Sequence, residues 1–278
     1  MDFSSETIRS RQNRAVVELE KLNDRREREA TGSFRFDGIK LAAEAIGAGL
    51  ELPRIFLRQS SAETVAATLR EQTGKDPASC AQKVLLLEDG LFDRVSEEKS
   101  PEGVICVAKY IDKLQKKITI YSSNSFSGLA GERIVLLESV RDPANVGAMI
   151  RSAAALGVDR LIMSADCADV YHSRAVRASM GTLFRQRIDR TDRLTEVIGQ
   201  LRESGRRVFA AALDPTAQRL GTFRPEKGDC VVIGNEGHGL REETVRACGN
   251  SVYIPMSERA ESLNAAVAAA ILMWEFAK

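Results

Sequence analysis

The chain has 278 residues, of which 44% are hydrophobic and 28% charged, and its formal net charge is +1. This length favours two domains, and this composition excludes a disordered, collagen-like or disulfide-stabilised protein. The net charge decides nothing about nucleic acid, because binding depends on local clusters of Lys and Arg.

Cysteine and histidine usage indicates where the protein works. The five cysteines are scattered and never form a Cys-x-x-Cys pair, which predicts free thiols in a reducing compartment. The only histidines are His172 and His238, and neither has a second ligand at zinc spacing, so no metal is expected. The amino-terminal residues do not resemble a signal peptide, and no apolar run approaches the roughly 20 residues that span a bilayer. We expect a cytoplasmic protein that does not enter a membrane.

The first half of the chain predicts a small α/β/α unit over residues 1–110. A charged amphipathic pattern over residues 7–30 predicts one helix, and a short strand at 34–36 turns at Asp37-Gly38 into a helix over 39–48 that ends at Gly49. Further strands are expected at 54–57, 84–87 and 103–108, with helices near 62–72 and 89–96.

Residues 111–130 have linker composition, first Lys-rich and then rich in Ser, Asn and Gly, so the domain boundary is expected there. Residues 131–278 then alternate between strand and helix patterns. This alternation predicts a parallel sheet with helices on both faces, whose ligands bind at the carboxyl ends of the strands. The strands are expected at 134–140, 160–164, 207–213, 230–234 and 252–256.

The first segment of interest, residues 142–151, directly follows the strand at 134–140. Pro143 ends the strand, Asn145 is predicted to be the helix N-cap, and Gly147 allows close approach of a ligand or backbone. Arg151 is expected to emerge near the same helix end. On spacing alone, an ordinary strand-to-helix connection with a surface arginine is the preferred explanation.

The second segment has three glycines in six residues, Gly234, Gly237 and Gly239, after a strand. They do not form the Gly-x-Gly-x-x-Gly fingerprint of dinucleotide folds, and a tight turn would explain them. Glu236 lies among them. Exposed backbone groups here suit a flat, adenosine-like ligand, while the carboxylate faces a cation or a hydroxyl.

The third segment consists of the last strand, which contains Ile254-Pro255-Met256, and the residues that lead from it to Ser262-Leu263-Asn264. Ser262 is expected to be the N-cap of the last helix, whose alanines allow close packing on another backbone. A purely structural role for Ser262 and Asn264 as caps explains this segment equally well.

Together and in this order, the three segments resemble the motifs of the SpoU (TrmH) RNA methyltransferases. The matching residues are Asn145-x-Gly147-x-x-x-Arg151, Gly234-Asn235-Glu236-Gly237-x-Gly239-Leu240, and Ile254-Pro255-Met256 with Glu261-Ser262-Leu263-Asn264. Residues 176–184 are similar to the connection between the first two motifs. The chain departs from the family at Asn264-Ala265-Ala266-Val267, where Asn-Val-Ser-Val is usual, so one hydroxyl contact is expected to be missing.

The resemblance implies a fold and an activity. The fold is α/β: a five- or six-stranded parallel sheet whose carboxyl-terminal segment forms a deep trefoil knot, preceded by a smaller α/β/α RNA-binding domain. More weakly, that first domain resembles kink-turn-binding ribosomal proteins. The implied activity is 2'-O-ribose methylation of RNA with S-adenosylmethionine as cofactor, on ribosomal RNA first and transfer RNA as the alternative. The knotted domains are expected to form a homodimer that completes the site.

The resemblance also assigns residue roles. Arg151 is the proposed catalytic residue, and we favour orientation and charge stabilisation over a role as base, because guanidinium stays protonated and a phosphate favours its charged form. The other candidate catalytic residues, implied to form a hydrogen-bonded shell, are Asn145, Glu236, Ser262 and Asn264. The residues implied to bind the cofactor are Gly234, Asn235, Gly237, Ile254, Met256, Leu263 and Asn264.

A local excess of positive charge suggests where RNA binds. Residues 174–193 contain six arginines and two aspartates, a net of +4. They would suit a phosphate track, and a solvated or dimer-facing surface explains them equally well. The arginines that we assign to RNA are Arg174, Arg177, Arg185 and Arg187. A second basic patch consists of Lys109, Lys113, Lys116 and Lys117.

Two other classes of function stay open. A non-catalytic RNA-binding factor would keep this fold, but the intact motif residues argue against it. A nucleotide-binding α/β domain would need a P-loop lysine or the dinucleotide fingerprint, and the chain has neither. Among enzymes, the self-protection methyltransferase of an antibiotic producer has the same architecture and is not distinguished.

Overall fold

The computed structural model describes residues 7–111, 131–257, 259 and 262–278, and they form two compact units. The first unit contains the residues up to Ile111 together with Tyr171–Arg185, and the second contains the others. Apart from Ile111, the expected linker at 111–130 lies outside the described residues. No helix in these described ranges is long and apolar enough to cross a membrane.

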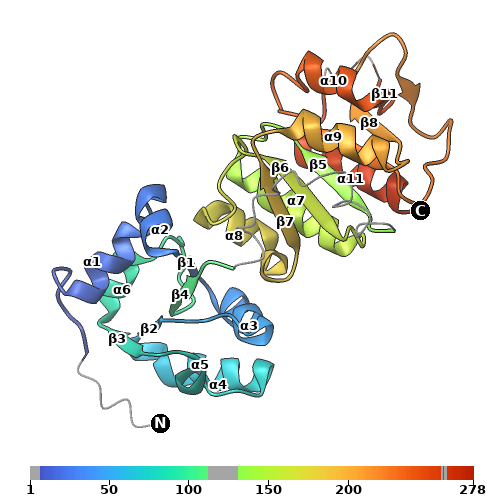
Figure 1. The fold of residues 1–278 in the computed structure, drawn as a ribbon. Coiled ribbons are helices and arrows are strands. Elements are labelled where there is room, and N and C mark those ends of the chain that lie inside the picture. The colour runs from blue at the N-terminus through green and yellow to red at the C-terminus, as the bar shows by residue number, and fades with distance from the viewer. Residues whose placement is uncertain (1–6, 112–130, 258, 260–261) are drawn as a thin grey trace. The chain divides into compact units, whose positions relative to one another are not determined.

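The first unit is built on a mixed four-stranded sheet in the order β1-β4-β2-β3 (Figure 1). β4 is antiparallel to both of its neighbours, and β2 is parallel to β3. Its strands are β1 (Ser33–Asp37), β2 (Arg54–Arg58), β3 (Val84–Leu87) and β4 (Val104–Lys109). Its helices are α1 (Arg14–Lys21), α2 (Arg25–Thr31), α3 (Ile39–Ala48), η1 (Gln59–Ser61), α4 (Ala62–Thr73), α5 (Pro77–Cys80), α6 (Asp89–Val95), α8 (Ser173–Ser179) and η4 (Thr182–Phe184).

Most sequence expectations for this unit are confirmed, and one is wrong. The helix over 39–48 is present and ends at Gly49, whose φ of 72° suits a residue without a Cβ. The single helix expected over 7–30 is two helices, because Asp24 accepts a hydrogen bond from the Arg26 amide and so starts α2. The short helix α5 was not predicted.

The segment Tyr171–Arg185 belongs to the first unit because aromatic side chains hold it there. The ring of Tyr171 stacks on Tyr110 with centroids 4.0 Å apart and lies 4.6 Å from Phe34, while the Phe184 ring lies 5.3 Å from Phe36. The Tyr171 hydroxyl also accepts a hydrogen bond from the Ile111 amide at 2.8 Å. A segment that follows β6 in sequence therefore completes the core of the first unit.

The second unit is built on a seven-stranded sheet in the order β7-β6-β5-β10-β8-β11-β9, and every neighbouring pair is parallel. Its strands are β5 (Ile134–Leu137), β6 (Arg160–Ser164), β7 (Arg187–Thr191), β8 (Val208–Ala211), β9 (Gln218–Arg219), β10 (Cys230–Ile233) and β11 (Gly249–Tyr253). The parallel α/β sheet is confirmed, but five or six strands were expected. Two strands were not predicted. β7 is rich in charged residues, and β9 is only two residues long.

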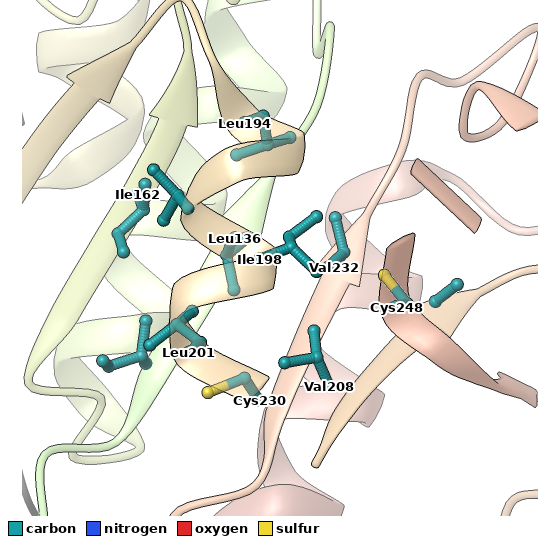
Figure 2. Close-up of a cluster of buried hydrophobic side chains, with 12 residues drawn as sticks. Leu136, Ile162, Leu194, Ile198, Leu201, Val208, Cys230, Val232 and Cys248 are labelled. Carbon is teal, nitrogen blue, oxygen red and sulfur yellow. The ribbon is translucent and has the colours of Figure 1, made fainter. Parts of the chain in front are cut away.

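Helices cover this sheet as the alternating pattern predicted. They are α7 (Pro143–Ala155), α9 (Leu194–Glu203), α10 (Glu242–Cys248) and α11 (Ala265–Ala277). Leu194, Ile198 and Leu201 of α9 pack on strand side chains that include Leu136 and Val232 (Figure 2). α7 packs against α11, and α9 against α10.

The strand order places two of the sequence motifs side by side. The first follows β5 and the second follows β10, and these strands are parallel neighbours with Val135 opposite Val231. From β5 the chain continues outward to β6, whereas from β10 it continues on the opposite side to β11. Loops diverge at such a reversal and leave a crevice at the carboxyl edge.

Candidate active site

The loop after β5 places Asn145 inside helix α7. The N-cap of α7 is Asp142, whose Oδ1 accepts a hydrogen bond from the Ala144 amide at 3.2 Å, and Pro143 is the first helical residue. The expected N-cap role of Asn145 is therefore wrong. Proline suits the first helical position because its missing N–H has no partner there in any helix. The Asn145 side chain is free of capping and makes other contacts.

The loop after β10 is closed on itself by hydrogen bonds. Asn235 and Gly239 exchange two backbone hydrogen bonds of 3.0 Å, and the Asn235 Oδ1 accepts from the Gly237 amide at 2.8 Å. The Asn235 Nδ2 donates to the Ser139 carbonyl at 2.8 Å, which joins this loop to the end of β5. A Cβ on Gly234 would lie 2.5 Å from the Gly239 carbonyl carbon, so only glycine permits this closure.

The segment after β11 places Asn264 at the start of α11. Asn264 is the N-cap, and its Oδ1 accepts from the Ala266 amide at 2.9 Å and the Val267 amide at 3.3 Å. The expected N-cap role of Ser262 is therefore wrong, and the exposed Ser262 lies two residues before the cap. Glu261 lies outside the described residues.

Side chains from the three motifs meet in one hydrogen-bonded chain. The Asn145 Nδ2 donates to the Glu236 Oε1 at 2.9 Å, and the Asn264 Nδ2 donates to the Asn145 Oδ1 at 3.1 Å. Positions 91 and 119 residues apart from Asn145 are thus joined through it. Asn264 caps a helix and contacts Asn145 at the same time, so its role as a cap does not exclude the role that the resemblance implies.

A cavity of about 630 Å³ lies beside this network, at the carboxyl edge of the sheet. Such a volume suits a ligand of cofactor size. Five of the seven residues expected to bind the cofactor line it: Gly234, Asn235, Ile254, Met256 and Leu263. Glu236 and Ser262 line it as well. Gly237 and Asn264 are not part of the lining.

The cavity wall is mostly apolar, with a few charged groups. Side chains of β10, β11 and α11 supply the apolar part, while Asp214, Glu242 and Arg246 supply charge. Hydrogen bonds from the hydroxyls of Ser251 and Thr216 hold the pKa of Asp214 below its ordinary value. Sequence reasoning missed Asp214, Glu242 and Arg246, because they follow β8 or lie on α10 and no spacing distinguishes them from surface charges.

Arg151 is not brought to the network within one chain. It lies six residues after Asn145 on α7, about 9 Å along the helix and about 120° around its axis. It is exposed and does not line the cavity. Within the described ranges its guanidinium has no hydrogen-bond or ion-pair partner.

The four arginines assigned to RNA divide between the two units. Arg174, Arg177 and Arg185 lie in the first unit, whereas Arg187 lies in the second. The Arg185 guanidinium pairs with Glu44 at 2.5 Å, and hydrogen bonds from Lys40 and Arg185 hold the pKa of Glu44 below its ordinary value. Of the lysine patch, Lys109 is described and donates to the Thr31 carbonyl, while the other three lysines lie outside the described residues.

Family models match both units. Residues 132–274 match the SpoU rRNA Methylase family. The chain belongs to this family. Residues 13–106 match the MRM3-like substrate binding domain. The first match therefore covers the seven-stranded sheet, and the second covers most of the four-stranded sheet.

Individual relatives match over nearly the whole chain. The 23S rRNA (guanosine(2553)-2'-O)-methyltransferase RlmP of Bacillus subtilis is 27% identical, covering 96% of this chain and 97% of its own. The 23S rRNA (uridine(2479)-2'-O)-methyltransferase of Streptomyces viridochromogenes is 29% identical, covering 91% and 85%. Among solved structures, an AdoMet-bound rRNA methyltransferase from Sinorhizobium meliloti is 27% identical, covers 98% and 97%, and has a TM-score of 0.76.

Proposed function

We infer that this protein transfers a methyl group from S-adenosylmethionine to a ribose 2'-hydroxyl of ribosomal RNA. The observation that carries this inference is the hydrogen-bonded chain Glu236–Asn145–Asn264 at the rim of the 630 Å³ cavity, built from all three family motifs. Two relatives that match over nearly the whole chain are named as 23S rRNA methyltransferases, so we propose 23S RNA ahead of transfer RNA as the substrate.

The cavity fits S-adenosylmethionine in size and in chemistry. The adenine ring needs a flat apolar slot, which Ile233, Ile254 and Leu263 offer. The ammonium and sulfonium groups need carboxylates, and the cavity has Asp214, Glu236 and Glu242. A methionine carboxylate needs a cation, and Arg246 is the arginine of the wall. A fully apolar or a fully acidic lining would exclude this cofactor, and the lining of this cavity is neither.

The protein's own residues orient the hydroxyl and hold the charges. The bound sulfonium supplies an electrophilic methyl group. Asn145 donates to one carboxylate oxygen of Glu236, and the other carboxylate oxygen can accept the hydrogen of a ribose hydroxyl at the cavity. Asn264 fixes the Asn145 amide in turn, so a shift of either asparagine displaces Glu236. Positioning of this kind lowers the barrier by holding the reacting atoms close together.

We propose that a second copy of the chain completes the site, as the family resemblance implies. Helix α11 exposes Val267, Ile271 and Trp274, and Trp274 is 57% exposed. This spacing of four and three residues makes one apolar stripe, which suits a helix-helix interface. Arg151 is exposed on α7, which packs against α11, so a dimer through this face would carry Arg151 into the interface region.

We propose the domain assignment expected from the sequence: an RNA-binding domain at 1–110, a linker at 111–130 and a catalytic domain at 131–278. The substrate-binding family match over residues 13–106 supports the first part. Since Arg174, Arg177 and Arg185 belong to the same compact unit, we propose that they bind RNA together with it, and that Arg187 does so from the catalytic unit. The deep trefoil knot and the cytoplasmic location stay predictions.

The test of this function measures cofactor binding and methyl transfer separately. Calorimetric titration with S-adenosylmethionine should give saturable 1:1 binding, and unmodified 23S ribosomal RNA should accept a labelled methyl group. Arg151→Ala should abolish transfer and leave cofactor binding within a few fold, because Arg151 does not line the cavity. Near-normal turnover of this variant would show that Arg151 is not catalytic. Absence of cofactor binding in the wild type would favour the non-catalytic RNA-binding factor.

A further inference from the structure

A second hollow, of about 440 Å³, lies against the hydrogen-bonded loop that follows β10 and that also lines the cofactor cavity. Its lining includes Ser139, Arg141, Asn235, His238 and Arg241. It shares residues 235 and 238–240 with the cofactor cavity, so the two spaces are separated by the same closed loop. None of the roles derived above uses Arg141 or Arg241.

The two arginines are gathered by one carboxylate. The Asp166 Oδ2 accepts from the Arg241 Nη2 at 2.7 Å and from the Arg141 Nη2 at 3.3 Å. The Arg241 Nη2 also donates to the Ser139 Oγ at 3.1 Å, and the Arg241 Nη1 lies 3.8 Å from the Glu138 Oε1. The Arg141 side chain is 67% exposed and the Arg241 side chain 51% exposed, so both side chains are accessible to solvent at the hollow.

The carboxylates beneath them are already satisfied. Asp166 also accepts from the Ser139 hydroxyl at 2.6 Å and the Ser164 hydroxyl at 2.5 Å. Burial raises the pKa of Asp166, but these hydroxyls and Arg241 outweigh it, so that the pKa lies below its ordinary value. Glu138 is 1% exposed and accepts from the Thr244 hydroxyl at 2.6 Å and the Arg241 amide at 2.9 Å.

Backbone geometry also indicates a built site. Ser139 has a φ of 55°, which is unfavourable for a residue with a side chain and persists only where the surroundings enforce it. This conformation directs its hydroxyl to Asp166 while its carbonyl accepts from Asn235. The hollow is therefore fixed to the motif loop and not to a variable surface turn.

We propose that this hollow binds a backbone phosphate of the RNA substrate, next to the ribose that is methylated, through Arg141 and Arg241. Paired, solvent-accessible guanidinium groups match the oxygens of a phosphodiester. Phosphates flank every ribose, and this hollow adjoins the cavity where the ribose must meet the methyl group. The proposal rests on the proposed function and names residues that position its substrate.

A carboxylate of the cofactor is the alternative source of negative charge. The cofactor cavity has its own arginine, Arg246, and the closed loop 235–240 separates it from Arg141 and Arg241. The phosphodiester is therefore the ligand to which the geometry points. Separate measurements of RNA binding and of cofactor binding distinguish these two ligands.

The experiment compares Arg141→Ala and Arg241→Ala with Arg133→Ala. Arg133 is exposed and immediately precedes β5, whereas Arg141 follows β5. The two arginines therefore lie at opposite edges of the sheet. Unmodified 23S ribosomal RNA is the probe, and methyl transfer gives kcat and KM. Filter binding of the same RNA at several salt concentrations gives the slope of log Kd against log salt. This binding assay does not depend on methyl transfer.

Each hollow variant should raise the KM for RNA about tenfold, leave the Kd for S-adenosylmethionine unchanged, and reduce the salt slope by about one. Arg141→Lys should restore the slope, because it restores the charge. Arg133→Ala should behave as the wild type does. An unchanged KM and slope in both hollow variants would overturn the proposal, and a changed cofactor Kd with normal RNA binding would assign the hollow to the cofactor. Wild-type protein that binds this RNA without methylating it would contradict the proposed function alone.

Discussion

The two sheets of this protein differ in where their strands end. In the first unit, β4 is antiparallel to both of its neighbours, so strands end at both edges of the sheet. In the second unit all seven strands are parallel, so each strand ends at one common edge. The cavity, the motif network and the second hollow all lie at that edge.

This difference explains why chemistry concentrates in one unit. A parallel sheet gathers residues that are far apart in sequence, as Asn145, Glu236 and Asn264 show. The mixed sheet instead devotes its buried faces to packing, with Val16 and Leu19 of α1 against Phe56 and Leu87 on one side. The first unit thus supplies a stable surface, and the second supplies a site.

The largest expected effect separates the stabilities of the two units. Phe34→Ala removes a fully buried ring that contacts Phe36, Tyr110, Tyr171 and Phe184. We expect a loss of about 3–5 kcal/mol from the first unit. Hydrogen exchange should show faster opening of β1 and β4, while cofactor binding in the second unit stays normal. Phe223→Ala, which removes a half-buried ring of the second unit, is the control. Equal loss of protection in both units would mean that they unfold as one.

The next effect should be confined to the second unit. Gly234→Ala places a Cβ 2.5 Å from the Gly239 backbone, so the loop between the two hollows must open. We expect the Kd for S-adenosylmethionine to rise about 100-fold, equivalent to about 2.7 kcal/mol. Calorimetry measures it, and Gly199→Ala is the control because its Cβ would meet nothing within 4 Å. A normal Kd would mean that closure of this loop does not shape the cofactor cavity.

A smaller effect divides the two roles of Asn264. Asn264→Ala removes the cap of α11 and should cost about 1 kcal/mol of unfolding free energy as well as activity. Asn264→Asp keeps the capping oxygen but loses the amide that donates to Asn145. It should retain thermal stability and lose about tenfold in kcat, a typical value for one positioning hydrogen bond. Normal kcat in the aspartate variant would assign Asn264 to capping alone.

The smallest effect concerns thiols, which should behave alike in both units. Burial raises the pKa of Cys230 to about 11 and of Cys248 to about 12, and it also raises the pKa of Cys106. Because the thiolate is the reactive form, these thiols should resist alkylation at pH 8, where the half-buried Cys80 reacts first. Mass spectrometry of the native protein measures the order. Early labelling of Cys230 would show that the second sheet opens locally.

Sequence patterns predicted the elements better than their junctions. The helix over 39–48 and the apolar strands were predictable because periodicity and glycine caps are local signals. The caps of α7 and α11 were misplaced, since Asp142 and Asn145, like Ser262 and Asn264, are all good cap residues. Proline at 143 was the local signal for Asp142. The site lining at Asp214 and the docking of Tyr171 on Tyr110 depend on contacts between distant segments, which no local pattern records.

The segment Tyr171–Arg185 has a consequence for how such proteins can be recombined. The first unit is made of two stretches of chain, one of which is encoded between strands of the catalytic sheet. An exchange of amino-terminal domains with a relative at the linker alone would leave Tyr171 and Phe184 facing a foreign surface without Phe34 and Tyr110. A successful chimera must therefore carry two inserts, the amino-terminal stretch and Tyr171–Arg185.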